Sequence, residues 1–433
     1  MIKKLVLVFI AFIAVQSYAQ ESSASPYSFY GIGSLKFKGT VENASMGGLS
    51  IYSDSIHINL RNPASYAGKN IAYYGNESRP VKYTIGGSHI NTKLTSDTNS
   101  DKVSSSTLNY LAISIPMGKF GFGFGILPFT SVGYKLETKN ENNDVLNRFR
   151  GDGGVNKAYF SLGYQITNDL SIGTDISYNF GNIKNSTIEF GYNNEGQPLQ
   201  RQSRENNRSD LSGLSFNIGL IYKKMLNDKI ELISGLTYTP KSNLNSNNER
   251  SISTITISNI TGQEFVLNTI EVDLGTLETT DLNLPSKFSF GAGIGQAHMW
   301  FVGAEYTLLN ASEFSNVLYS STETVYEDAS AFSLGGFYIP KYNSFTSYFK
   351  RVVYRAGIRF ENTGLNINSE TINEFGISFG LGLPIGNAFS NANIGVEIGN
   401  RGTTDNNLIK ENFVNFQISF SLNDRWFQKR KYD

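Results

Sequence analysis

The strongest constraint on the fold is an alternation of apolar and polar residues that recurs along most of the chain. Between Leu170 and Phe180 every second residue except Thr174 is bulky and apolar, and the residues between them are small or polar. Because the side chains of a β-strand alternate between its two faces, this segment has one apolar and one polar face. Repeated segments of this kind predict an all-β chain, and apolar faces directed outward are typical of a transmembrane barrel.

Composition narrows the classes of function. Charged residues make up 17% of the 433 residues, against about 25% in an average protein. Lys+Arg and Asp+Glu balance at 37 each, so electrostatics gives no reason to expect a nucleic-acid partner. The chain has no cysteine, which excludes disulfides and thiolate metal sites.

The first residues resemble an export signal. Lys3 and Lys4 precede an apolar run over residues 5–15. This run is shorter than the stretch that a helix needs to span a membrane. A small-x-small site follows, so we expect cleavage between Ala19 and Gln20, with an uncleaved anchor as the alternative. No later stretch is apolar enough for a transmembrane helix, so a membrane protein with this sequence would need strands closed into a barrel.

About fourteen segments show the alternation. They cover residues 81–94, 107–116, 119–136, 156–166, 169–180, 211–223, 229–238, 286–296, 299–309, 331–339, 352–361, 373–383, 392–401 and 413–422. An even number of strands places the N-terminus and the C-terminus of the barrel on the same side of the membrane. The predicted domains are a signal peptide (1–19), a compact N-terminal element (20–80), a barrel (81–423) and a basic tail (424–433).

The connectors also sort into two classes. Short ones, such as 117–118 and 297–298, alternate with long polar ones, such as 137–154, 181–208 and 239–283. The moderately long connector 340–349 is the exception. Transmembrane barrels have short periplasmic turns and long outer loops. The pattern therefore predicts an outer-membrane protein in which the first and the last barrel strand both have their free chain ends in the periplasm.

Counting along the strands assigns charged side chains to the barrel lumen. A charge on the lipid side at mid-depth would cost about 2–4 kcal/mol, and the alternation avoids this. The expected luminal charges are Asp175, Glu305, Arg355, Arg359, Glu397 and Arg401.

Two features depart from a regular barrel strand. Pro128 lies between Leu127 and Phe129 inside the third strand, where it lacks the donor that a ladder needs. It predicts either a local opening in the wall or a strand that has already left the membrane. Glycines also share one face in three strands, which favours close approach of another backbone segment inside the barrel. They are Gly121, Gly123 and Gly125; Gly291, Gly293 and Gly295; and Gly376, Gly380 and Gly382.

Enzyme chemistry is not indicated. The three histidines, His57, His89 and His298, have no Ser or Asp partner at a recognisable spacing. No cluster of residues has the spacing of metal ligands. We therefore expect neither catalytic residues nor a metal or other cofactor.

The N-terminal element resembles the hatch of the FadL-like outer-membrane transporter family. The motifs are Gly31-Ile32-Gly33, Ala44-Ser45-Met46-Gly47-Gly48 and Asn62-Pro63-Ala64, with later matches at Leu284-Pro285 and Tyr354-Arg355-Ala356-Gly357. The resemblance covers essentially the whole mature chain. The extended end after Asn423 is similar to FadL-like chains of the Bacteroidota.

The resemblance implies a fourteen-stranded barrel whose lumen holds an N-terminal hatch, with lateral release of hydrophobic cargo at a kink in the third strand. Carried over, the lateral opening would be formed by Leu127, Pro128 and Phe129. The hatch residues would be Gly31, Gly33, Met46, Gly47, Gly48, Asn62, Pro63 and Ala64.

Two functions remain open at this point. One is a passive conduit for small hydrophobic, fatty-acid-like molecules. The other is an accessory barrel subunit of a larger outer-membrane assembly or secretion machine, which would bind protein partners through the long connectors 181–208 and 239–283. Outer-membrane lipids are expected to surround the barrel in both cases.

Overall fold

The computed structural model describes residues 25–54, 56–68, 80–258, 261–314, 324–385 and 390–424. The expected signal peptide (1–19), its cleavage site and the cationic side chains of the tail at 425–431 lie outside the described residues.

The described strands form a closed antiparallel barrel with fourteen wall strands. Three wall strands are built from two pieces: β4 and β5, β9 and β10, and β12 and β13. Pairing of β20 with β2 closes the ring. The wall consists of β2 (Val81–Thr95), β3 (Ser100–Met117), β4 (Phe120–Pro128) with β5 (Thr130–Lys139), β6 (Val145–Gln165), β7 (Leu170–Glu189), β8 (Gln202–Met225), β9 (Glu231–Thr239) with β10 (Ser242–Ile257), β12 (Thr279–Leu284) with β13 (Lys287–Gln296), β14 (Trp300–Leu309), β16 (Ala329–Tyr338), β17 (Val353–Ile367), β18 (Glu370–Ile385), β19 (Ser390–Arg401) and β20 (Lys410–Asp424).

The remaining elements are short. None of the helices that the structure describes is long and apolar enough to cross a membrane. These elements are β1 (Ser34–Leu35), β11 (Glu264–Glu271), β15 (Thr324–Tyr326), α2 (Val41–Ala44), η1 (Pro26–Phe29), η2 (Pro63–Tyr66), η3 (Gly275–Leu277), η4 (Ala311–Glu313), η6 (Phe349–Arg351) and η7 (Asp405–Asn407).

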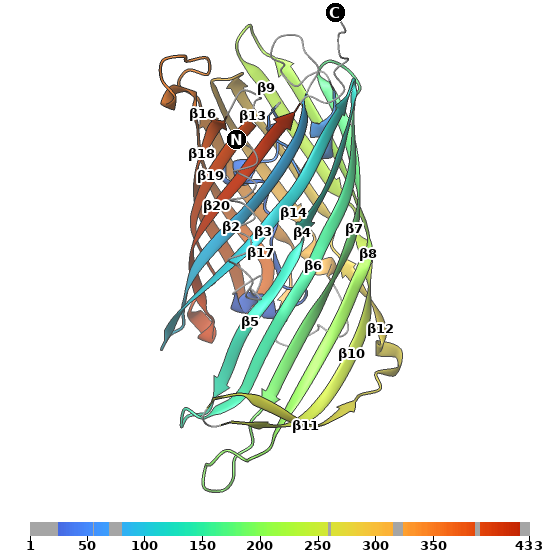
Figure 1. Ribbon diagram of the computed structural model, residues 1–433, viewed down its shortest axis with the longest axis vertical. Coiled ribbons are helices and arrows are strands. Elements are labelled where there is room, and N and C mark those ends of the chain that lie inside the picture. The colour runs from blue at the N-terminus through green and yellow to red at the C-terminus, as the bar shows by residue number, and fades with distance from the viewer. Residues whose placement is uncertain are drawn as a thin grey trace, which may run out of the picture.

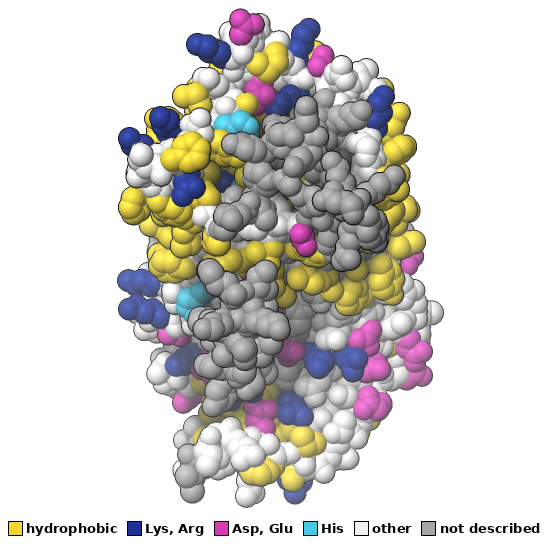
Figure 2. Space-filling model, turned by 45° about the horizontal axis from the view of Figure 1, so that its top comes forward, with side chains coloured by type: hydrophobic (Ala, Val, Ile, Leu, Met, Phe, Trp, Pro, Cys, Tyr) yellow, Lys and Arg dark blue, Asp and Glu magenta, His cyan; other side chains and the backbone are white. Residues whose placement is uncertain are grey.

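The alternation in β7 corresponds to two faces of the wall. Ile176 and Tyr178 are 46% and 50% exposed on the outside, whereas Ser177 and Asn179 are completely buried on the inside. This is the reverse of a soluble protein, in which apolar side chains are the buried ones. The same outward exposure recurs around the wall, and Figure 2 shows hydrophobic side chains gathered across the middle of the visible face, with polar and charged ones dominating below. An apolar surface of this extent is what a membrane barrel presents to lipid.

The wall is taller than the sequence predicts. The connectors 137–154, 181–208 and 239–283 were expected to be loops, and this expectation was wrong over much of their length. They contain the ends of β5 to β8, all of β10 and β11, and all but the last residue of β12, which extend the wall at the lower end in Figure 1. The outward side chains of these extensions are mostly polar, and apolar side chains such as Ile183, Leu244 and Leu282 point inward. The regular row of outward apolar residues that marks a membrane strand is therefore absent.

The outward face of β18 gives a direct test of the membrane assignment. Ile377 lies between Ile358 and Ile398 in register, so its side chain belongs to the apolar surface. We expect Ile377→Arg to lower the free energy of unfolding in phospholipid vesicles by about 2–4 kcal/mol, because the charge enters hydrocarbon. Ile252→Arg is the matched control, since Ile252 is 46% exposed but lies in the polar extension formed by β10. Equal effects of both substitutions in urea titrations would contradict the assignment.

Candidate functional site

The N-terminal segment, residues 25–68, lies against the inner face of the barrel wall. Two local signals shape it. Thr40 accepts a hydrogen bond at the start of α2, and Asn62 does the same for η2, where Oδ1 accepts from the Ala64 amide at 3.0 Å. Pro63 occupies the first position of η2, where its fixed φ suits a helical start. The Asn62 amide also donates to the Leu220 carbonyl of β8, so the cap ties the segment to the wall.

A ring of wall glycines makes room for this segment. On each of these glycines, an added Cβ would lie between 1.7 and 3.1 Å from an atom of the N-terminal segment. Many of them are direct cross-strand neighbours, as in the run Gly121, Gly163, Gly173 and Gly219. The glycine girdle consists of Gly121, Gly163, Gly173, Gly219, Gly235, Gly291, Gly303, Gly335, Gly357, Gly380 and Gly395.

Much of the contact along the girdle is backbone against backbone. A Cβ on Gly173 would lie 2.3 Å from the Pro63 carbonyl carbon, and one on Gly357 would lie 2.2 Å from the Gly47 amide nitrogen. Such distances are well inside van der Waals contact. Residues 63–64 and 46–47 therefore occupy the space that side chains fill in an ordinary small barrel.

The three glycine patches noted in the sequence divide between two roles. Gly121 and Gly123 contact Tyr66, Gly291 contacts Ile51 and Gly380 contacts Ser45, as close approach of another backbone segment predicts. The others instead make room for wall atoms, including the rings of Tyr159 and Phe301 and the side chains of Glu397 and Arg355; they are Gly125, Gly293, Gly295, Gly376 and Gly382. Most girdle glycines were missed, because their alignment exists only across strands.

The other expected hatch residues also lie in close contact with the wall or within turns of the segment. Gly33 has φ of 89°, and a Cβ there would meet the Ser131 carbonyl oxygen at 2.4 Å. Gly31, Gly47 and Gly48 share the positive φ that favours glycine. Met46 is 2% exposed and its carbonyl faces Gly335.

The wall strand that contains Pro128 breaks immediately after it. β4 ends at Pro128 and β5 begins at Thr130. The Phe129 amide donates a hydrogen bond to the Val155 carbonyl of β6. The Phe129 carbonyl accepts one from the Lys36 amide of the N-terminal segment at 3.0 Å. Successive amides of a strand point to opposite neighbours. The missing N–H of Pro128 therefore falls on the edge that faces β3.

Beyond this break β3 and β5 separate. Within the continuously described residues 80–258, β3 pairs with β4 only from Leu111 to Met117. β5 pairs on its other edge with β1, through Ser34 with Ser131 and Leu35 with Thr130. A piece of the N-terminal segment thus takes the place that β3 would hold in a regular wall.

The bend at the break extends into the next two strands. Gly153 and Gly154 of β6 have φ of 117° and 141°, which L side chains rarely adopt. A Cβ on Gly154 would meet the Thr130 carbonyl oxygen at 2.4 Å, and one on Gly181 of β7 would meet the Gly154 carbonyl oxygen at 2.1 Å. Gly153 and Gly154 were expected to lie in a loop, so this role was not predicted.

Cavities adjoin both sides of the break. A groove of about 430 Å³ is lined by Lys36, Leu108, Pro128 and Thr130 and by the glycines of the bend. A luminal cavity of about 300 Å³ is lined by Leu127 and Phe129 and by Leu35 and Phe37 of the N-terminal segment, together with residues of many wall strands. Residues 34–38 and 127–129 therefore lie between the luminal cavity and this groove.

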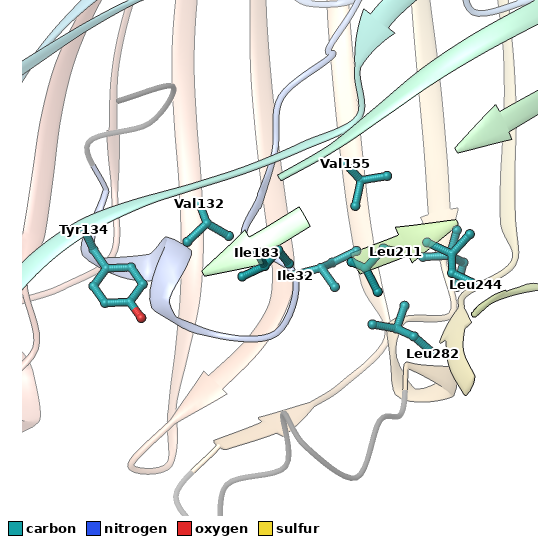
Figure 3. Close-up of a cluster of buried hydrophobic side chains, with 9 residues drawn as sticks. Ile32, Val132, Tyr134, Val155, Ile183, Leu211, Leu244 and Leu282 are labelled. Atoms are coloured by element: carbon teal, nitrogen blue, oxygen red, sulfur yellow. The ribbon is translucent and has the colours of Figure 1, made fainter. Parts of the chain in front are cut away.

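An apolar cluster holds the N-terminal segment next to the break. Ile32 packs among inward-facing side chains of β5 to β8, β10 and β12, with Phe129 at its edge. Figure 3 shows Ile32 between Ile183 and Leu211, with Val132 on one side and Leu244 on the other. These wall residues lie in or next to the extension of the barrel. The inner surface of the barrel is therefore partly apolar at this level.

One of the expected luminal charges fixes the segment directly. Glu305 of β14 is 3% exposed. Its carboxylate accepts from the Ser50 amide at 2.7 Å and from the Arg61 guanidinium at 2.8 Å. Burial of a carboxylate is tolerated when it is paired and hydrogen-bonded.

Arg359, Glu397 and Arg401 meet in one ionic cluster. Its centre is Glu374 of β18, which contacts Arg359 and Lys38 and accepts from the Arg401 Nε at 2.8 Å. Lys38 comes from the N-terminal segment. Glu374 and Lys38 were not singled out in the sequence, because no local pattern marks a charge pair between distant segments.

The remaining expected charges lie apart from that cluster. Asp175 accepts from the Asn217 amide at 2.9 Å and lines the luminal cavity. The Arg355 guanidinium donates to the side-chain oxygen of Asn393 at 3.1 Å. Asn393 also donates to Glu42 of α2.

The histidines do not converge on a shared site. His57 contacts Asp54 through Nδ1 at 2.7 Å, His89 contacts Ser106, and His298 stacks on Tyr342. Among the described residues, no group of three or more His, Asp or Glu side chains could hold a metal ion. The organised features are therefore the seated segment and the interrupted wall.

A comparison with models of known protein families shows to which family the chain belongs. The family model described as BamG matches residues 1–433. The chain belongs to the BamG family. This description differs from the FadL-like family suggested by the sequence motifs. No curated protein matches this chain.

Solved structures show where the FadL resemblance holds. The Ralstonia pickettii toluene transporter TbuX matches with a TM-score of 0.57 at 14% identity, over 89% of this chain and 98% of that chain. The P. putida toluene transporter TodX gives 0.57 at 17% over the same shares. A Pseudomonas aeruginosa FadL homologue gives 0.56 at 13%, again over 89% and 98%. At these identities the likeness shows the fold, so the barrel architecture implied by the resemblance is confirmed.

The girdle predicts a specific sensitivity to small substitutions. Gly173→Ala should displace residues 63–64, because its Cβ would fall inside the Pro63 carbonyl, and overpacking of this kind costs about 1–3 kcal/mol. We expect faster proteolysis of the N-terminal segment in the folded, detergent-solubilised protein. Gly87→Ala in β2 is the control, since its nearest atom is a wall carbonyl oxygen at 3.2 Å. Unchanged cleavage in Gly173→Ala would contradict the seating described above.

The ionic cluster predicts a large effect of one neutral substitution. Glu374→Gln leaves Arg359, Arg401 and Lys38 without their central anion, and an uncompensated buried charge costs about 3–5 kcal/mol. We expect a corresponding loss of unfolding free energy in urea titrations in vesicles. Glu137→Gln breaks the pair with Arg148, where the Glu137 side chain is 38% exposed, and should cost about 0–1 kcal/mol. Similar losses in the two variants would show that Glu374 is not central to the cluster.

Proposed function

We propose that this protein is an outer-membrane conduit for small hydrophobic molecules, with lateral release through the break at Pro128. The observation that carries the proposal is the separation of β3 from β5, next to a groove of about 430 Å³. In a barrel that only anchors a partner, an interrupted wall would expose backbone groups to lipid at a cost. A passage for cargo gives this interruption a use.

The luminal cavity suits a fatty-acid-like cargo. Its apolar lining includes Tyr30, Leu60 and Phe314, and its cationic lining includes Lys157 and Lys287. A cavity of about 300 Å³ is at the lower end of the usual range for small-molecule sites, which are mostly apolar with a few polar groups. TbuX and TodX are described as toluene transporters, and we extend hydrophobic cargo to this chain as part of the proposal.

In this proposal the N-terminal segment is the hatch, and Gly31, Gly33, Met46, Gly47, Gly48, Asn62, Pro63 and Ala64 keep it seated. The girdle contacts of residues 46–47 and 63–64 support a fixed seat. The pairing of β1 with β5 supports a smaller movable part at residues 34–36. Two residue pairs and the adjoining hydrogen bond from the Lys36 amide to Phe129 hold β1, so its release breaks fewer contacts than removal of the whole segment.

Outer-membrane placement completes the proposal. The end of the barrel with the short turns would face the periplasm, and export would use a cleaved signal peptide over residues 1–19. The division into hatch (20–80), barrel (81–423) and periplasmic tail (424–433) follows from this orientation. The apolar outer surface and the closed wall support the membrane part of the statement.

The accessory-subunit hypothesis gains no support from the connectors that motivated it. Much of 181–208 and 239–283 is strand, which extends the barrel wall or forms the β10–β11 ribbon. The BamG description names no partner. We therefore prefer the conduit.

A reversible crosslink tests the gate. Ser34 and Ser131 are cross-strand partners, and such Cα atoms lie about 4.5–5.5 Å apart, within reach of a disulfide. The chain has no cysteine, so Ser34→Cys with Ser131→Cys gives one defined bond. Oxidation should lower the uptake of a fluorescent fatty acid by vesicles with a lipopolysaccharide outer leaflet, and reduction should restore it.

The control crosslink joins two strands away from the break and from the luminal cavity. Ser253 and Thr269 are partners in β10 and β11, with their hydroxyls 3.0 Å apart. Oxidation of this cysteine pair should leave uptake unchanged. Equal uptake by the oxidised and reduced Ser34–Ser131 pair would contradict the gate, and wild-type uptake equal to that of empty vesicles would contradict the conduit.

A further inference from the structure

The connector between β16 and β17 differs from the other turns at its end of the barrel. Residues 340–351 read Pro-Lys-Tyr-Asn-Ser-Phe-Thr-Ser-Tyr-Phe-Lys-Arg, with three cations, four aromatic rings and no acidic residue. Figure 1 shows the segment after β16 standing away from the barrel wall at the upper end of the molecule. The combination of aromatic and cationic side chains in an outward projection requires an explanation.

The aromatic rings are presented to the surroundings by a folded connector. Phe345 is 99% exposed and Phe349 is 74% exposed. The Lys341 amide donates to the Lys350 carbonyl at 2.8 Å, which closes the connector into a loop. On the luminal side Tyr342 stacks on His298 with ring centroids 4.5 Å apart. A held loop that exposes two phenylalanines has the properties of an interaction surface.

Hydrogen bonds place the exposed rings beside the lipid-facing side of the wall. The Tyr354 hydroxyl donates to the Phe349 carbonyl at 3.2 Å, and the Tyr348 hydroxyl donates to the Pro384 carbonyl at 3.1 Å. Tyr354 and its cross-strand partner Tyr338 are 38% and 53% exposed on the outer surface. The connector therefore continues the apolar outer surface of β16 and β17 at the rim of the barrel.

We propose that residues 341–351 form a foot that binds the headgroup layer of the membrane, with a preference for anionic phospholipid. Aromatic rings are favoured at the boundary between hydrocarbon and water. Lys341, Lys350 and Arg351 stand within the same loop, and cations near an anionic membrane surface are attracted to it. Continuity with the lipid-facing wall and the absence of acidic residues favour lipid over a protein partner. The inference requires a membrane barrel, but it does not rest on transport.

The cysteine-free chain allows a direct test with the full-length protein. Phe345→Cys carries an NBD fluorophore, and the protein is reconstituted into phosphatidylcholine vesicles with or without phosphatidylglycerol. We expect blue-shifted emission and at least twofold stronger quenching by headgroup-labelled or shallow doxyl lipids than by a deep doxyl lipid. Glu195→Cys, in an exposed connector at the other end of the barrel, is the matched control and should show aqueous emission. Thr346→Cys is a second position if the Phe345 variant does not fold.

Charge reversal separates the contribution of the cations from that of the rings. Lys350→Glu with Arg351→Glu should abolish the extra quenching that phosphatidylglycerol produces at position 345. Heat-modifiable migration on gels would verify that each variant is folded. Aqueous emission at both positions 345 and 346 in both lipid mixtures would overturn the proposal and leave a protein as the occupant of this surface. Quenching that is independent of phosphatidylglycerol would overturn the anionic preference.

Discussion

Close contact between the N-terminal segment and the backbone of the wall is the constraint on which the rest of this structure depends. A small barrel normally fills its interior with side chains from its own strands. Here glycines remove those side chains at one level of the wall, and residues 46–47 and 63–64 occupy the space. Backbone contact leaves little freedom for adjustment, because no flexible side chain can move aside. The seat therefore fixes residues 46–47 and 63–64 against the wall.

Electrostatic contacts fix the segment a second time. Glu305 binds Ser50 and Arg61 on one side, and Glu374 binds Lys38 on another. These carboxylates come from β14 and β18, so the N-terminal segment is tied to strands well separated around the wall. Both carboxylates are buried and would be costly without their partners, which makes correct seating a condition for a stable barrel interior.

The interrupted wall leaves a free strand edge with which the segment pairs. Pro128 removes a donor from the edge that faces β3, and the positive φ of Gly153 and Gly154 bends β6 beside it. Residues 34–36 then pair with the free edge of β5. Fixed contacts along the girdle and a short, weak pairing at the break differ greatly in strength. The proposed gate therefore moves residues 34–36, while residues 46–47 and 63–64 stay in place.

The sequence by itself determined the class of fold, the approximate number of strands and the direction of their faces, and it marked Pro128 as an irregular position without deciding whether the wall opens there. Alternation with period two is a local property, so Leu170–Phe180 reveals its two faces without any knowledge of its neighbours. The same reasoning placed Asp175, Glu305 and Arg359 inside the barrel. It failed for the wall extensions, where the outward side chains are mostly polar and the regular row of outward apolar residues is absent.

Tertiary structure alone decided what those faces contact. The register between strands aligns Gly121, Gly163, Gly173 and Gly219 into one surface, although they lie far apart in the sequence. It also brought Lys38 to Glu374 and β1 to the free edge of β5. These pairings are set by the closure of the barrel around the segment. Closure is a property of all the wall strands together, and no single stretch of sequence encodes it.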